Sequence, residues 1–410
     1  MTTDEMNTIA ANLEKYIEIY YEKVSIDNAQ QVIREFDDNW SIIPNYLIDE
    51  TEKRQSKYGL ALVIFSVANY EIDNLTEDKV VRMSNLIDEY ERNTNVKYQF
   101  GIKEALFFNL GSCWHKLGML YDNEAIEAFK KYVYYIITQS SNTSYRPTAY
   151  AFRKCTPFLY NSLINDRLNL SSPTTFNDPF DCPIIPLMKL SNNVDDIVPL
   201  VRKAYLDCLK VACFVSNTKL PYLKNPKDVL SAPVFDEKKH LSDKKEFLNE
   251  LMWAHYADSH RGICIKYRFC ESISQLGNTN VNVVSYFKDV EYSDEALNTY
   301  SNKNAINMKD AFFLKGKQWE YENELRFIYF DLNSNSDYGT ISIPNCIEAI
   351  YFGLNCSKED KERIISIMKT KKHVTKDLRG TVISEEPIQF YQMELDDEHF
   401  GQIKETRITV

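Results

Sequence analysis

Residues 315–330 read KGKQWEYENELRFIYF, a polar and charged stretch that passes directly into an apolar one. The apolar end, 325–330, is rich in aromatic and β-branched residues, which is typical of a buried strand. Successive side chains of a strand point to opposite faces, so a strand extended backwards would place Glu322, Glu324 and Arg326 on one face. If that face is exposed, it is an ion-paired edge, which contributes little to stability. If it lies in a cleft, it carries a candidate catalytic carboxylate oriented by Arg326.

Similar short strand-like runs lie on both sides of this stretch and alternate with helical stretches, which predicts an α+β domain over residues 141–410. Within it, residues 219–245 carry three prolines and many charges. This charged insertion is expected to be a lid or, as composition alone favours, a solvated surface loop. The other runs are 211–215, 262–267, 281–286, 340–343 and 349–352.

Residues 1–140 instead carry apolar side chains at three- and four-residue spacing with few helix breakers, which predicts an all-helical domain. The polar turn at 139–144 marks its end. The last helix pair resembles a tetratricopeptide hairpin, a helical repeat unit, through Phe107, Leu110, Gly111 and Trp114 on one helix and Ala125 and Phe129 on the other. An ordinary helical bundle is the alternative. The expected helices cover 5–25, 28–50, 55–73, 77–93, 101–118 and 122–139.

The composition excludes two kinds of nucleotide site. The chain has 11 glycines in 410 residues, against a typical ~7%, and contains neither GxGxxG nor GxxxxGK[ST]. Both motifs need bare backbone where phosphate approaches closely. The formal net charge of −11 opposes binding to duplex nucleic acid.

Nothing in the sequence indicates membrane insertion, secretion or a metal centre. No apolar run reaches 18 residues and the N-terminus lacks a signal-peptide pattern, so we expect a soluble cytoplasmic protein. The nine cysteines include no CxxC pair, and we expect most of them to be reduced and buried. The spacing of His255, His260 and Cys264 matches no standard zinc motif, so no metal site is predicted.

Two further polar groups are candidates for ligand binding. Asn177 and Asp178 precede Pro179, which disfavours helix and predicts a turn whose side chains either orient a ligand or cap the chain locally. Residues 252–259 are expected to be helical, with Trp253, Tyr256 and Ala257 on one buried face. His255 and His260 are candidates for binding or proton transfer, although a structural role is the safer interpretation of each.

Taken in order, these groups resemble a family of mostly bacterial proteins known as domain of unknown function 2971. The resemblance covers about residues 145–360 and leaves out the helical region. The residues that carry it are Tyr145-Arg146, Phe176-Asn-Asp-Pro-Phe-Asp181, Cys213-Phe-Val-Ser216, Met252-Trp-Ala-His-Tyr-Ala257, His260-Arg-Gly262, Val290-Glu-Tyr292, Lys317, Trp319-Glu-Tyr-Glu-Asn-Glu-Leu-Arg326 and Ile350-Tyr-Phe-Gly353.

The layout is also similar to the ADP-ribosyltransferase superfold, which implies a split, mostly antiparallel sheet whose cleft binds NAD without a glycine-rich loop. The resemblance gives Arg146 the position that grips the nucleotide and Glu322 or Glu324 the catalytic one, with Arg326 beside them. Tyr256 or Ser216 would take the middle position. The remaining residues implied around NAD are Tyr145, Asn177, Asp178, Trp253 and His255.

The resemblance therefore implies an NAD-dependent enzyme that modifies a protein or nucleic acid, as a toxin or phage-defence effector does. Its helical domain would bind a protein partner or antitoxin. One alternative is a metal-dependent nuclease or hydrolase that uses Asp178, Asp181, Glu322 and Glu324 as ligands. A second alternative is a non-enzymatic adaptor built on the helical region.

Overall fold

The computed structural model divides into two compact units, one formed by Met1–Ser140 and Ile185–Cys208 and the other by Ser141–Ile184 and Leu209–Val410. Each unit is treated separately below. The structure describes residues 3–39, 52–71, 75–94, 100–138, 148–176, 178, 181, 196–216, 248–269, 282–294, 312–334, 336–376, 381–399 and 401–410. The predicted insertion at 219–245 lies outside these residues.

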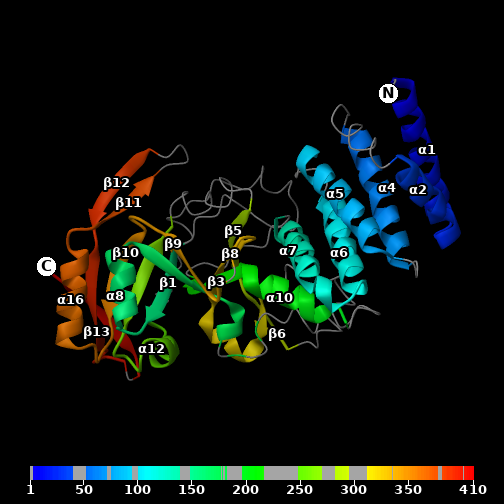
Figure 1. The fold of residues 1–410 in the computed structure, drawn as a ribbon. Helices are drawn as coiled ribbons and strands as arrows, with labels where there is room; N and C mark the ends of the chain where they lie inside the picture. Colours follow the sequence, from blue (N-terminus) through cyan, green and yellow to red (C-terminus); the bar gives the residue numbers. More distant parts are fainter. Residues whose placement is uncertain are drawn as a thin grey trace. The chain divides into compact units, whose positions relative to one another are not determined.

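The first unit is helical, which confirms the fold class predicted for this end of the chain (Figure 1). A later helix, α10 (Val198–Cys208), also belongs to it and packs on α7. The sequence had assigned α10 to the α+β domain, because nothing local to residues 198–208 identifies the surface on which the helix packs. The other described helices are α1 (Thr3–Glu22), α2 (Ile26–Asn39), α4 (Glu52–Glu71), α5 (Glu77–Asn93), α6 (Phe100–Lys116) and α7 (Asp122–Thr138).

Helices α6 and α7 pack closely, with a short 3-10 turn, η2 (Met119–Tyr121), between them. Phe107 and Phe129 are fully buried in this pair. A Cβ atom at Gly111 would lie 2.6 Å from the Phe129 ring, so glycine allows the close approach of the two helices. The spacing read from the sequence thus corresponds to a packed hairpin.

The second unit contains a large mixed sheet whose described strands pair antiparallel except for β10 and β13, which pair in parallel. It confirms the predicted mostly antiparallel α+β class. One path through the sheet is β14-β13-β10-β4-β1-β3-β2-β9, with β8 pairing β3 and β5. The strands are β1 (Thr148–Arg153), β2 (Arg167–Ser171), β3 (Leu209–Ser216), β4 (Ile263–Arg268), β5 (Val283–Asp289), β8 (Glu324–Asp331), β9 (Tyr338–Ser342), β10 (Ile347–Phe352), β13 (Gln389–Leu395) and β14 (Ile403–Ile408).

The sheet is divided between β1 and β3. Strand β1 pairs with β4 along its whole length but meets β3 at only two positions, Ala149 with Ser216 and Tyr150 with Val215. Strand β3 pairs with β8 over residues 209–215. Two half-sheets, β14-β13-β10-β4-β1 and β9-β2-β3-β8-β5, are therefore joined by a short seam and separate beyond it.

Both faces of the first half-sheet are buried. Alternate residues of β1 enter different cores: Ala149 and Ala151 pack on one face, and Tyr150 and Phe152 pack on the other. Helices α8 (Pro157–Ile164) and α16 (Lys358–Met368) cover the first face (Figure 1). Helix α12 (Glu250–Tyr256) contributes Met252 and Trp253 to the second core. Burial on both faces fixes the strand register, because a one-residue shift would exchange the two sets of side chains.

The turn from α12 into β4 is unusually tight. Three successive residues, Asp258, Ser259 and His260, have positive φ angles of 51°, 53° and 66°. A Cβ atom at Gly262 would lie 2.2 Å from the carbonyl oxygen of Arg153, which no side chain tolerates. Glycine at this position is therefore required by the close approach of the β1 and β4 backbones.

The remaining elements that the structure describes in the second unit are a 3-10 helix, two small sheets and a second short 3-10 turn. These are η6 (Lys317–Glu322), η3 (Pro173–Thr175), β6 (Glu291–Ser293) with β7 (Leu314–Gly316), and β11 (Lys372–Lys376) with β12 (Val382–Pro387). None of the helices in the described ranges combines the length and apolar character that a membrane crossing requires.

Candidate active site

The stretch 315–330 forms three consecutive elements: β7, the 3-10 helix η6 and strand β8. Strand β8 begins at Glu324, so Glu324 and Arg326 share a strand face as predicted, but Glu322 is the last residue of η6. The strand expected to include Glu322 was therefore too long. It is interrupted by Asn323, which adopts a left-handed conformation (φ 43°) and whose side chain donates to the Ser216 carbonyl at 2.7 Å.

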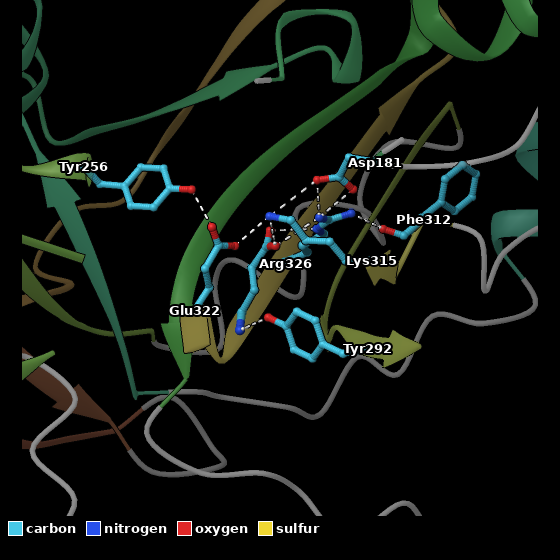
Figure 2. Close-up of polar contacts among 8 residues, drawn as sticks. Asp181, Tyr256, Tyr292, Phe312, Lys315, Glu322 and Arg326 are labelled. Carbon is cyan, nitrogen blue, oxygen red and sulfur yellow. Dashed lines mark hydrogen bonds and ion pairs between the residues drawn. The ribbon is translucent and has the colours of Figure 1, made fainter. Parts of the chain in front are cut away.

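Arg326 is completely buried and anchors the site (Figure 2). Its Nε and Nη2 donate to the two carboxylate oxygens of Glu324 at 2.7 and 3.0 Å. Nη2 also contacts Asp181 at 2.7 Å, and Nη1 donates to the Phe312 carbonyl at 2.7 Å. Such forked contacts suit the rigid guanidinium. Arg326 thus connects β8 with residues 181 and 312, which are far apart in the sequence.

Lys315 stands between three carboxylates. Its Nζ lies 2.6 Å from Glu322 Oε2, 3.2 Å from Glu324 Oε2 and 3.6 Å from Asp181 Oδ2. Burial alone would lower the pKa of Lys315, but the carboxylates, Glu324 foremost, outweigh burial and raise it. The ammonium group is therefore held in its charged form at the position where a metal ion would have to sit.

Two tyrosines complete the polar network. The Tyr256 hydroxyl, at the end of α12, donates to Glu322 Oε1. The Tyr292 hydroxyl accepts from the backbone N–H of Glu324 at 2.8 Å, and burial raises the pKa of Tyr292. The Tyr292 phenol therefore stays neutral at physiological pH.

Among the residues that the structure describes, the charges of this network do not balance. Asp181, Glu322 and Glu324 supply three carboxylates, whereas Lys315 and Arg326 supply two cations. Among the described residues, Glu324 and Asp181 each contact both cations, whereas Glu322 contacts one cation, Lys315, and the Tyr256 hydroxyl. We therefore assign the uncompensated negative charge of the network to Glu322.

Glu324 makes the second unit sensitive to acid. Burial opposes its ionisation, but Arg326 and Lys315 outweigh burial and lower its pKa from 4.5 to about 2. A carboxyl with a lowered pKa stabilises the fold above its ordinary pKa, and this contribution is lost as the pH falls. We expect a loss on the order of 3 kcal/mol between about pH 5 and pH 2.

Acid titration followed by hydrogen exchange of β8 amides measures this dependence. In a Glu324→Gln variant the slope should be reduced, while Glu320→Gln, at an exposed position on the preceding short helix η6, should retain it. An unchanged slope in Glu324→Gln would show that another carboxyl is responsible.

A cavity of about 560 Å³ opens where β1 and β3 separate, and Glu322 and Glu324 lie in its wall. Ligand sites in proteins commonly measure ~300–1,000 Å³. Lys315, Asp181 and Tyr256 also line it. Three basic residues, Arg153, Lys154 and Arg167, contribute to other parts of the wall. The buried charge network therefore faces a space of ligand size that carries positive groups elsewhere.

Several residues singled out in the sequence lie elsewhere. Trp253 is fully buried and makes an edge contact with Phe152, so it is a core residue rather than a wall of the cavity. Ser216 is buried and pairs with Asn323 through its backbone, 2.8 Å from Ser216 N to Asn323 O. Asp178 is also buried. The predicted ligand-binding residues Tyr145, Arg146 and Asn177 lie outside the described residues.

His255 is exposed and lines a second hollow, together with Tyr256, Gln318, Trp319 and Tyr321. His260 is half-buried, stacks on Trp253 and does not line either cavity; burial lowers its pKa. The stacking contact with Trp253 is compatible with a structural role for His260.

Sequence reasoning missed Lys315, Tyr292, Trp319 and Tyr321, and gave Asp181 a role only as a metal ligand. A signal for Lys315 was present, because a lysine close to several acidic residues and a buried strand requires a carboxylate partner if it is buried. Nothing local indicated that Asp181, which lies 145 residues from Arg326, would contact it.

Residues 252–327 match the family model described as "Protein of unknown function (DUF2971)". The matched segment runs from within α12 through β4, β5 and η6 to the start of β8, and thus contains Tyr256, Lys315 and all three residues Glu322, Glu324 and Arg326. This finding supports the family resemblance over that part of the chain. Searches of curated proteins and of solved structures found no match.

Proposed function

We propose that the second unit is an NAD-dependent ADP-ribosyltransferase-like enzyme that transfers ADP-ribose to a macromolecule. The observation that carries this proposal is the surplus carboxylate charge at Glu322, held by Lys315 and Tyr256 in the wall of a cavity at the split of the sheet. The family match itself names no reaction.

The cavity fits NAD as a substrate in three respects. Its volume of about 560 Å³ falls within the range of small-molecule sites. Arg153, Lys154 and Arg167 supply cations for a pyrophosphate group, which this glycine-poor chain would not bind on a bare backbone loop. Phe176, Tyr256 and other rings in the wall offer stacking surfaces.

Cleavage of the bond between nicotinamide and ribose develops positive charge on the sugar. A carboxylate that is already in place stabilises charge that appears only in the transition state. Glu322 is suited to this task, since Tyr256 and Lys315 hold its two oxygens and no reorganisation is needed when charge develops. Glu324 and Arg326 position this arrangement from β8.

The metal-dependent hydrolase is less compatible with this geometry. Its ligands would be Asp178, Asp181, Glu322 and Glu324, but the Lys315 ammonium lies within 3.6 Å of the last three carboxylates. A divalent cation could enter only if Lys315 left the network and became buried without partners, which is costly.

Incubation of the full-length protein with NAD and a cell lysate tests the proposal. We expect free nicotinamide, measured by chromatography, and transfer of an adenosine-labelled NAD fragment to macromolecules. Both signals should be unchanged by EDTA, because Lys315 supplies the positive charge that a metal would supply. Absence of both products would refute the transferase proposal, and activity abolished by EDTA would favour the hydrolase.

The helical unit is proposed to recognise a protein partner, as a tetratricopeptide-like hairpin does. Its support is the packed α6–α7 pair and two apolar side chains at the connecting turn, Met119 and Leu120, which are 86% and 91% exposed. A role as a toxin or phage-defence effector, with an antitoxin or target as the partner, follows from the family resemblance alone.

A further inference from the structure

A second hollow, of about 350 Å³, shares Tyr256 with the first cavity as a lining residue. Its wall consists of His255, Tyr256, Gln318, Trp319 and Tyr321. We call it the aromatic hollow. Four of its five lining residues carry rings, and none is acidic in a chain of net charge −11.

The rings are held in place by their neighbours. The side chain of Asn249 caps α12 and also donates to the Tyr321 carbonyl at 2.8 Å, so it connects α12 to η6. Lys315 Nζ lies 5.0 Å from the centre of the Trp319 ring, within the range of a cation–π contact. Ring centres of Trp319 and Tyr321 are 6.2 Å apart, and those of His255 and Tyr321 are 6.3 Å apart. The hollow is therefore preformed.

Its chemistry matches a flat, uncharged, heteroaromatic ligand. Heteroaromatic rings such as nucleobases stack on aromatic side chains whichever base they are. The exposed amide of Gln318 offers both a hydrogen-bond donor and an acceptor to the edge of such a ring. A volume of about 350 Å³ lies near the lower end of the range for ligand sites. It is suited to one base rather than to a dinucleotide.

We propose that the aromatic hollow binds a purine or pyrimidine base as the acceptor of ADP-ribose, an inference that rests on the proposed function. In the transfer, the bond between nicotinamide and the ribose C1 breaks and its electron pair leaves with neutral nicotinamide. A nitrogen of the base forms the new bond to C1 and gives up its proton to Glu322. The Tyr256 hydroxyl, which donates to Glu322, connects the base site to the carboxylate.

The test uses the Glu322→Gln variant of the full chain, in which binding is measured without turnover. It is titrated by calorimetry with adenosine, guanosine, cytidine and uridine, and with short single-stranded oligonucleotides of each base. We expect at least one base to bind, and Trp319→Ala in the same background to weaken it about 5- to 150-fold. Tyr338→Ala, which removes an exposed aromatic ring of β9, should have no effect.

The outcomes separate the possibilities. A nucleoside that binds while its oligonucleotide does not identifies a free nucleoside as the source of the base; an oligonucleotide that binds at least as tightly identifies an unpaired base in a strand. Failure of every ligand to bind, or binding insensitive to Trp319→Ala, overturns the proposal. Displacement of the base by NAD also overturns it, because the hollow would then hold a ring of NAD.

The proposed function is judged independently, by nicotinamide release from the unmodified protein. Nicotinamide release without base binding would support the proposed enzyme activity and refute a base as the acceptor. Base binding without nicotinamide release would support the binding site and refute the transfer of ADP-ribose.

Discussion

Glu322→Gln is expected to lower the rate of nicotinamide release by about 10²- to 10³-fold, the loss commonly seen when one preorganised group that stabilises transition-state charge is removed. The free energy of unfolding should stay within about 1 kcal/mol of that of the unmodified protein. The substitution is thus expected to lower activity without lowering stability. The measurements are chromatography of nicotinamide and chemical denaturation.

The fold should survive because glutamine preserves most of the contacts. Its carbonyl oxygen can accept from Lys315, and its amide group can donate to the Tyr256 oxygen, since a hydroxyl both donates and accepts. The substitution also leaves two carboxylates, Asp181 and Glu324, with two cations. Removal of the surplus charge relieves repulsion in the network.

Glu320→Gln is the matched control, because it makes the same chemical change on the same short helix at an exposed position. It should leave both activity and stability unchanged. Glu324→Gln should instead reduce stability, since Glu324 fills the forked contact with Arg326. Full activity in Glu322→Gln would remove Glu322 from the mechanism.

Much of the fold could be predicted from local pattern. The runs at 211–215, 262–267 and 349–352 are strands because short segments of β-branched and aromatic residues fit a sheet that is buried on both faces. The helix spacing of residues 1–140 was equally informative, since an apolar stripe every three or four residues has one simple explanation. These features depend on residues within a few positions of one another.

The site depends on contacts that local pattern does not contain. Strand β8 does not extend back to Glu322, because the side chain and backbone of Asn323 both pair with Ser216, which is 107 residues away. Asp181 reaches Arg326 across 145 residues. The sequence therefore indicated that Arg326 and the glutamates would gather there, but the participation of Lys315 and Asp181 could be assigned only from the structure.

Arg326→Met is expected to destabilise the second unit by about 3–5 kcal/mol, the usual cost of removing one partner from a buried ion pair. The substitution removes the hydrogen bonds and ion pairs that the fully buried guanidinium makes with Glu324, Asp181 and the Phe312 carbonyl. Of the two cations in the described network, Lys315 then remains in contact with Glu324 and Asp181. Hydrogen exchange followed by mass spectrometry should show faster exchange of β3 and β8 amides by about 10²- to 10³-fold or more, with helices α6 and α7 as an internal reference.

Arg407→Met is the matched control, because Arg407 is exposed on β14 and the same change there should cost less than about 0.5 kcal/mol. The origin of the loss is tested by combining Arg326→Met with Glu324→Gln. If the cost arises from an uncompensated buried carboxylate, the double variant should be more stable than the sum of the two single losses predicts. Strict additivity would instead assign the cost to lost packing, and an Arg326→Met protein as stable as the Arg407→Met control would mean that Arg326 does not hold the network together.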